Sequence, residues 1–97
     1  MRHFHRTQLV PADVLAVADE FFARLALATD RPSMRSRTFS GPLGTLTLDV
    51  KPEGGHYTFV EAATDQIGES RLDKNVKKFF VELHRRADPA HRLAAGY

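Results

Sequence analysis

Residues 68–87, GESRLDKNVKKFFVELHRRA, carry two side-chain stripes at the spacing of one amphipathic helix. The apolar positions recur at steps of three and four: Leu72, Val76, Phe79, Phe80, Leu83 and Ala87. The second stripe is basic and consists of Arg71, Lys74, Lys78 and Arg85. A helix with one apolar face buries that face against another layer, so this segment predicts a small domain in which the helix covers a sheet.

The helix is expected to begin after Ser70 and to end near Ala87. Ser70 is a suitable N-cap, and Asp73 stands where the acidic partner of a capping box would be. Pro89 disfavours a longer helix, and the tail from about residue 88 is expected to be irregular or a docking extension.

A second amphipathic helix is predicted from about Ala12 to Ala28. Its apolar positions follow the same spacing: Val14, Val17, Ala18, Phe21, Phe22, Leu25 and Ala28. Pro11 suits the first turn of a helix, and Pro32 disfavours its continuation.

Four segments have the character of strands: residues 3–9, 33–40, 45–51 and 56–64. Glycine and proline at 41–44 and 52–55 predict turns between the last three. In TLTLDVK the apolar Leu46, Leu48 and Val50 alternate with polar residues, which is typical of a strand with one buried face. The order β-α-β-β-β-α predicts an α+β fold, an antiparallel sheet with two helices packed on one face.

The composition fits a single domain over residues 1–97, with 42% hydrophobic and 27% charged residues. The absence of cysteine excludes disulfides, thiolate metal sites and cysteine nucleophiles. The first residues, MRHFHRTQLV, do not resemble a secretory signal, and no apolar run approaches the roughly 20 residues that span a bilayer. We therefore expect a cytoplasmic protein without a membrane partner.

Two helices on one face of the sheet leave the other face without a cover. Thr45, Thr47, Asp49 and Lys51 are expected there, with either Arg35 and Arg37 or Ser36 and Thr38 beside them, depending on register. A polar face of this kind suits solvent. Tyr57, Phe59 or Val60 on it would favour a contact surface instead, and a symmetric homodimer is the commonest assembly.

The histidines do not define a metal or catalytic site. His3 and His5 would share one face of a strand, but no third ligand is evident. His56 follows Gly54-Gly55 and would point away from Glu61, so this string is interpreted as a hairpin turn entering a strand. No nucleophile elbow, phosphate loop or dinucleotide fingerprint is present. We expect a non-enzymatic binding module without a metal or other cofactor.

The basic stripe supports a second hypothesis. Arg71, Lys74, Lys78 and Arg85, together with Arg35 and Arg37, would follow a phosphate backbone, so the alternative is an RNA- or ribosome-associated protein. Acidic Glu69 and Asp73 lie within the stripe and would offset part of its charge.

Three families share parts of this element order. The order β-α-β-β-β-α resembles that of short ribosome hibernation factors, which bind the small ribosomal subunit. Without the first strand it is similar to double-stranded RNA-binding domains, although GESRLDKNVKKFF has Leu72 and Asp73 where those domains have a small-residue, lysine-rich start. These similarities concern shape, and no residue role is carried over.

The segments TQLVPADVLAVADEFF and LDKNVKKFFVELHRR also resemble helix-grip proteins of the START and Bet v 1 kind, in which a long helix lies on the sheet. This resemblance implies a third alternative, a binder of a small apolar ligand. Its pocket would be lined by Tyr57, Phe59, Phe79 and Phe80.

Overall fold

The computed structural model describes residues 1–25, 27–30, 35–54, 57–67 and 69–87. Its elements in chain order are β1 (Arg2–Thr7), α1 (Pro11–Ala23), β2 (Ala28–Asp30), β3 (Ser36–Gly41), β4 (Gly44–Glu53), β5 (Tyr57–Thr64) and α2 (Arg71–Ala87). The predicted tail, His56 and residues 33–34 of the second predicted strand lie outside the described residues.

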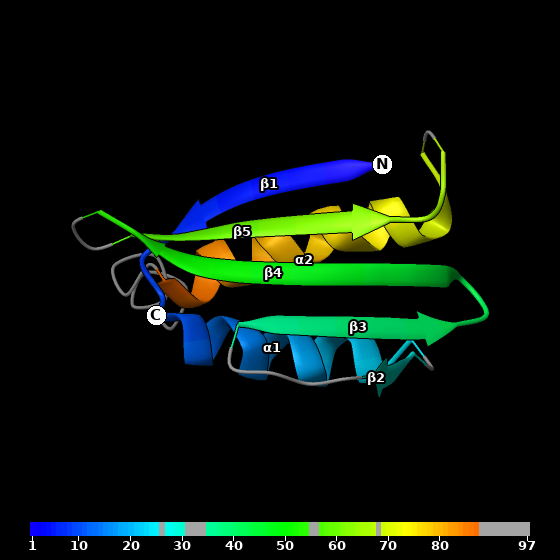
Figure 1. Cartoon of the computed structure of the whole chain (residues 1–97), viewed down its shortest axis with the longest axis horizontal. Helices are drawn as coiled ribbons and strands as arrows, with labels where there is room; N and C mark the ends of the chain where they lie inside the picture. Colours follow the sequence, from blue (N-terminus) through cyan, green and yellow to red (C-terminus); the bar gives the residue numbers. More distant parts are fainter. Residues whose placement is uncertain (26, 31–34, 55–56, 68, 88–97) are drawn as a thin grey trace, which may run out of the picture.

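The five strands form one antiparallel sheet in the order β1-β5-β4-β3-β2. Both helices lie on the same face of this sheet (Figure 1). Helix α2 packs against β1 and β5, and α1 packs against β4, β3 and β2. The predicted α+β class and the order β-α-β-β-β-α are confirmed, with one additional short strand.

The core lies between the sheet and the two helices. Leu46, Leu48 and Val50 of β4 face the helices and are buried, as their alternation predicts. The rings of Phe22, Phe39 and Phe79 are fully buried and pack around one another, with centroids 5.0 Å (Phe22–Phe39) and 5.1 Å (Phe22–Phe79) apart. Each buried side chain of this size contributes about 1.5–3 kcal/mol, so this layer fixes which sheet face is covered.

The prediction that the first helix continues to Ala28 was wrong. Helix α1 ends at Ala23, and the amides of Leu25 and Leu27 both donate to the carbonyl of Phe22. Ala28 begins β2, which pairs with β3 through Ala28↔Ser40 and Asp30↔Thr38. Backbone pairing at the end of the sheet therefore overrides the helical spacing of Leu25 and Ala28.

A two-residue turn, Pro42-Leu43, joins β3 to β4 and is closed by the pair Gly41↔Gly44. Gly44 has φ +127°, and an added Cβ would lie 2.6 Å from the carboxylate of Asp65. That carboxylate accepts a hydrogen bond from the amide of Thr45 at 3.0 Å. The backbone conformation therefore favours glycine here, and an added Cβ would also displace the side-chain ends of Asp65 and Gln66.

Candidate functional site: the open sheet face

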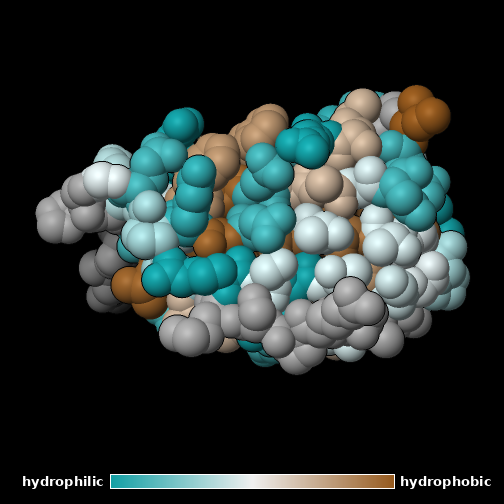
Figure 2. Space-filling model, viewed as in Figure 1, coloured by the Kyte–Doolittle hydropathy of each residue, from teal (hydrophilic) through white to brown (hydrophobic). Residues whose placement is uncertain are grey.

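The side chains of the sheet alternate between the helices and the uncovered face, which we call the open face (Figure 2). The open face comprises Arg2, Phe4 and Arg6 of β1; Ser36, Thr38 and Ser40 of β3; Thr45, Thr47, Asp49, Lys51 and Glu53 of β4; and Tyr57, Phe59, Glu61 and Ala63 of β5. The predicted threonine-rich side of β4 is confirmed. The register selects Ser36 and Thr38, rather than Arg35 and Arg37, for this face.

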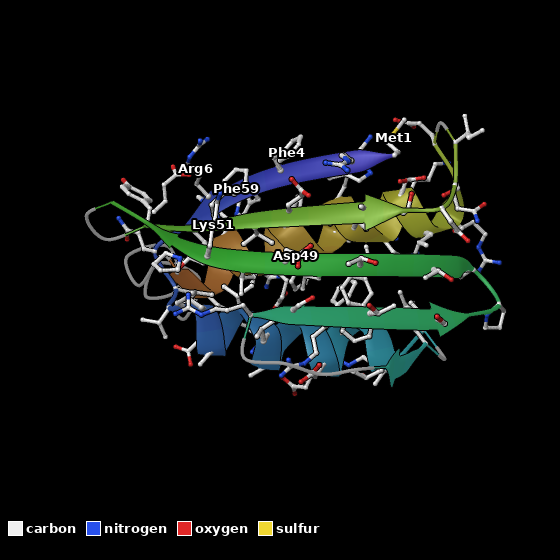
Figure 3. All side chains as sticks on the ribbon, viewed as in Figure 1. Met1, Phe4, Arg6, Asp49, Lys51 and Phe59 are labelled. Atoms are coloured by element: carbon white, nitrogen blue, oxygen red, sulfur yellow. The ribbon has the colours of Figure 1, made fainter. Side chains whose placement is uncertain are left out.

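Two phenylalanines stack on the open face, on the edge strand β1 and its neighbour β5. The rings of Phe4 and Phe59 are 5.7 Å apart and inclined by 21°. Phe4 remains 54% exposed, because no element of the described chain covers it. Figure 3 shows the two rings side by side, one from β1 and one from β5. An aromatic pair in water on an otherwise polar face marks the place where contact with another molecule would bury the most apolar area.

Cations flank this aromatic pair. The guanidinium of Arg6 lies 5.1 Å from the centre of the Phe59 ring, and the ammonium of Lys51 lies 5.5 Å from it. Both distances are within the range of cation–π attraction. Together with Phe4, these side chains form an ordered amphipathic patch.

The charges of the open face are arranged in two rows that cross the strands. The sheet register places Phe4, Glu61 and Asp49 side by side, and we call them the acidic row. Two residues further along each strand lies the basic row of Arg6, Phe59 and Lys51. A shallow hollow of about 190 Å³ lies between the rows and is lined by Asp49, Lys51, Phe59 and Glu61, with Val50.

Ion pairs use some of these charges. Arg2 lies 3.6 Å from Glu61, and Arg6 donates to Glu53 at 2.6 Å. Asp49 makes no ion pair with a described residue, and neither does Lys51. Among the described side chains of this face, three cations (Arg2, Arg6, Lys51) and three carboxylates (Asp49, Glu53, Glu61) balance in formal charge.

The predicted six-cation surface is divided between two parts of the fold. Arg71, Lys74, Lys78 and Arg85 are exposed on α2, under β1 and β5. Arg35 precedes β3, on the part of the sheet that α1 covers. Arg37 pairs with the core residue Leu48, so its side chain points towards α1.

There Arg37 forms a 3.2 Å ion pair with Asp19. Its side chain is only 16% exposed. It therefore does not extend the basic stripe.

The predicted apolar pocket is also divided. Phe79 is fully buried in the core, and Phe80 stacks on His5 on the same side of the sheet. Tyr57 and Phe59 lie on the open face. Tyr57, at the start of β5, also borders a hollow with His5 and His84, whereas Phe59 lines a different hollow, so these four side chains do not line one cavity.

His3 and His5 share a face, as predicted, but they contact α2 separately. His3 Nε2 lies 2.7 Å from Asp73 Oδ1, whereas the His5 ring stacks on Phe80 with centroids 5.0 Å apart. His5 Nε2 is buried and has no hydrogen-bond partner among the described residues. Burial, and then the nearby charge of His84, hold the pKa of His5 below 6.5. Within the described ranges, no three histidine or acidic side chains are grouped closely enough to hold a metal ion.

Asp73 is the centre of a buried polar cluster. Its carboxylate accepts hydrogen bonds from the hydroxyls of Ser70 (2.6 Å) and Thr64 (2.9 Å), and its amide donates to Ser70 at 3.0 Å. Burial alone would raise the pKa of Asp73, but the hydrogen bonds from Ser70, His3 and Thr64 lower it below its ordinary value. The predicted cap is confirmed. The Asp73 carboxylate, however, points inward rather than offsetting the basic stripe.

The sequence interpretation missed Phe4, the residue that completes the aromatic patch. The alternation His3, Phe4, His5 was the available signal, because burial of the histidines against a helix forces Phe4 to the other face. No protein-family model matches the chain, and no curated protein is similar to it in sequence. In the part of the chain that the structure describes, no helix is long and apolar enough to cross a bilayer.

Proposed function

We propose that this chain is a small, non-enzymatic interaction module that acts as a homodimer, with the open face as the contact surface. The observation that carries the proposal is the stacked Phe4–Phe59 pair on β1 and β5 of the uncovered face, in which Phe4 remains exposed to water. Aromatic anchors surrounded by polar side chains are the usual composition of a protein interface.

Charge favours a second copy of the chain over a nucleic acid at this face. A surface that follows phosphates needs an excess of cations, since its affinity comes largely from neutralising them. Among the described side chains of this face, Arg2, Arg6 and Lys51 are matched by an equal number of carboxylates. A balanced face is complementary to itself, as a two-fold symmetric interface requires.

The free edge of β1 is a less suitable place for a second copy. Two β1 strands paired antiparallel about Phe4 would place Arg2 of each copy opposite Arg6 of the other. Like charges directly opposite one another destabilise a strand pair, and charged edge strands resist this kind of association. On the open face, carboxylates and cations lie in separate rows, so two copies have an arrangement that avoids like-charge contact.

Sedimentation velocity between 1 and 100 µM tests the proposal. We expect a dimer that dissociates on dilution, and we expect the double variant Phe4→Ser/Phe59→Ser to be monomeric throughout. Val81→Ser removes an exposed apolar side chain from α2, on the helix side of the sheet, and should leave the dimer unchanged. A wild-type protein that is monomeric at 100 µM would overturn the proposal, as would a double variant that dimerises like the wild type.

A second candidate function, RNA binding through α2, is favoured by one observation. Arg71, Lys74 and Lys78 are exposed and make no ion pair with a described residue, whereas Lys77 pairs with Glu69 at 2.7 Å. Fluorescence anisotropy with labelled RNA at 50 and 200 mM salt tests it. We expect Lys74→Glu/Lys78→Glu to abolish salt-sensitive binding, with Lys77→Glu as the weaker control. Equal RNA affinity of the wild type and the double variant would reject this candidate.

A further inference from the structure

We infer that the two copies pack face to face about a two-fold axis that crosses the strands and passes between the acidic row and the basic row. The inference rests on the proposed homodimer and adds which residues of the two copies meet. Two sheets packed in this way lie about 10 Å apart, a distance that side chains from both faces can fill.

The arrangement of the two rows favours this axis over a two-fold axis that runs parallel to the strands. An axis parallel to the strands would place each row opposite the same row of the other protomer. Asp49 and Glu61 of one protomer would then face Asp49 and Glu61 of the other. An axis perpendicular to the strands exchanges the rows, so Asp49 approaches a cation and Glu61 approaches the Phe59 ring between two cations. Because like-charge contacts across an interface cost several kcal/mol, electrostatics decides between the two axes.

The selected axis places each strand opposite its own copy, running in the opposite direction. On β4, Asp49 of each protomer meets Lys51 of the other, which gives two equivalent ion pairs. On β1, Arg6 approaches the exposed ring of the other protomer's Phe4. On β5, Glu61 approaches the other copy's Phe59, a ring that already has two cations within 5.5 Å.

These contacts involve the charged side chains that have no ion-pair partner within the described part of one chain. Asp49 and Lys51 are the charged residues of the two rows without an ion pair among the described residues, whereas Glu61 and Arg6 have partners in Arg2 and Glu53. The hollow between the rows lies beside the inferred axis and offers room for a long side chain from the other copy. Asp49 and Lys51 are thus matched only in the dimer.

Charge reversal at these two positions tests the inference by sedimentation equilibrium. Asp49→Lys places two lysines opposite two lysines, and Lys51→Asp places two aspartates opposite two aspartates. Each single variant should raise the dimer dissociation constant by about tenfold or more. The double variant Asp49→Lys/Lys51→Asp restores both pairs and should dimerise within about threefold of the wild type. Asp13→Lys and Lys78→Asp, at exposed helical positions, are the controls for net charge.

Mixing the two single variants provides the sharpest readout. A chain with lysine at both positions is complementary to a chain with aspartate at both, so the mixture should form a one-to-one heterodimer while each variant alone stays largely monomeric. If the wild type dimerises but the single variants dimerise equally well, or the mixture forms no heterodimer, this axis is wrong and the homodimer proposal stands. A monomeric wild type removes the homodimer proposal itself. Both positions are exposed, and circular dichroism of each variant verifies the fold.

Discussion

His3 donates a hydrogen bond from Nε2 to Asp73 Oδ1, 2.7 Å away, and so joins the edge strand β1 to the first turn of α2. An ionised carboxylate can only accept, which fixes the proton of His3 on Nε2. The two residues are 70 positions apart, and the Asp73 side chain is 1% exposed. The contact is part of the buried cluster with Ser70 and Thr64. Disrupting this cluster is therefore expected to lower the free energy of unfolding.

Asp73→Ala is expected to lower the free energy of unfolding by about 2–4 kcal/mol at pH 7, because it removes a buried charge and leaves three hydrogen-bond donors without an acceptor. Urea denaturation followed by circular dichroism measures the change. Asp13→Ala, at an exposed position of α1, is the control and should cost less than about 1 kcal/mol. Equal losses in the two variants would show that the buried cluster has no special role.

The stabilisation by Asp73 should depend on pH. The hydrogen bonds hold its folded pKa below the ordinary 3.8, so the unfolded chain takes up the proton first as the pH falls. The contribution is therefore complete above about pH 5 and is lost as the pH falls through 3.8 towards the folded pKa. Unfolding free energies of the wild type and Asp73→Asn, measured from pH 7 to pH 2.5, should converge at the acidic end. A constant difference over this range would contradict the lowered pKa.

His5→Phe is expected to stabilise the fold by about 0.5–1.5 kcal/mol at pH 7.5, because it keeps the stack on Phe80 and removes a buried nitrogen that has no partner among the described residues. The gain should grow as the pH falls. Since the folded pKa of His5 lies below 6.5, the unfolded wild type binds a proton that the folded state resists, and the wild type loses stability below that pH.

Thermal unfolding of both proteins from pH 7.5 to pH 5 measures the effect. His84→Gln changes an exposed side chain and should shift stability by less than about 0.5 kcal/mol at pH 7.5. A loss of stability in His5→Phe at every pH would show that the imidazole nitrogen has a favourable contact.

Gly44→Ala should destabilise the protein by about 1–3 kcal/mol, because φ +127° is strained for alanine and the methyl group would displace Asp65 and Gln66. Gly54→Ala is the matched control: nothing lies within 4 Å of its added Cβ, and a change within about 0.5 kcal/mol is expected. Chemical denaturation of the two variants and the wild type measures both changes in the free energy of unfolding. Equal stabilities would mean that the turn between β3 and β4 adjusts without cost.

The elements predicted correctly from sequence are those in which one periodic pattern extends over several turns or residues. The stripe from Leu72 to Leu83 and the alternation around Leu48 each report a single buried face, and burial alone determines both. The three residues of β2 are too few to show the alternation of apolar and polar side chains that indicates a strand. Its formation depends on pairing with β3, a partner that the local sequence does not reveal.

The candidate site was predictable only in part, since its key contacts join distant positions. That one sheet face would be open followed from two apolar helical stripes, and Phe59 was a candidate for it. Phe4 became visible only when β1 was found beside β5. Arg37 was misplaced for a similar reason, because one step of register decides whether it faces water or Asp19.

The pairing of β1 with β5 has a consequence for how the chain acquires its structure. The partners in this ladder are 51 to 61 positions apart, from Thr7↔Thr58 to Arg2↔Ala63, whereas β3 and β4 close through a two-residue turn. During synthesis β1 leaves the ribosome before β5, so it cannot form its ladder until β5 has followed. Contacts this far apart in sequence cost more loop-closure entropy than a tight turn, so we expect the hairpin of β3 and β4 to form before the ladder of β1 with β5.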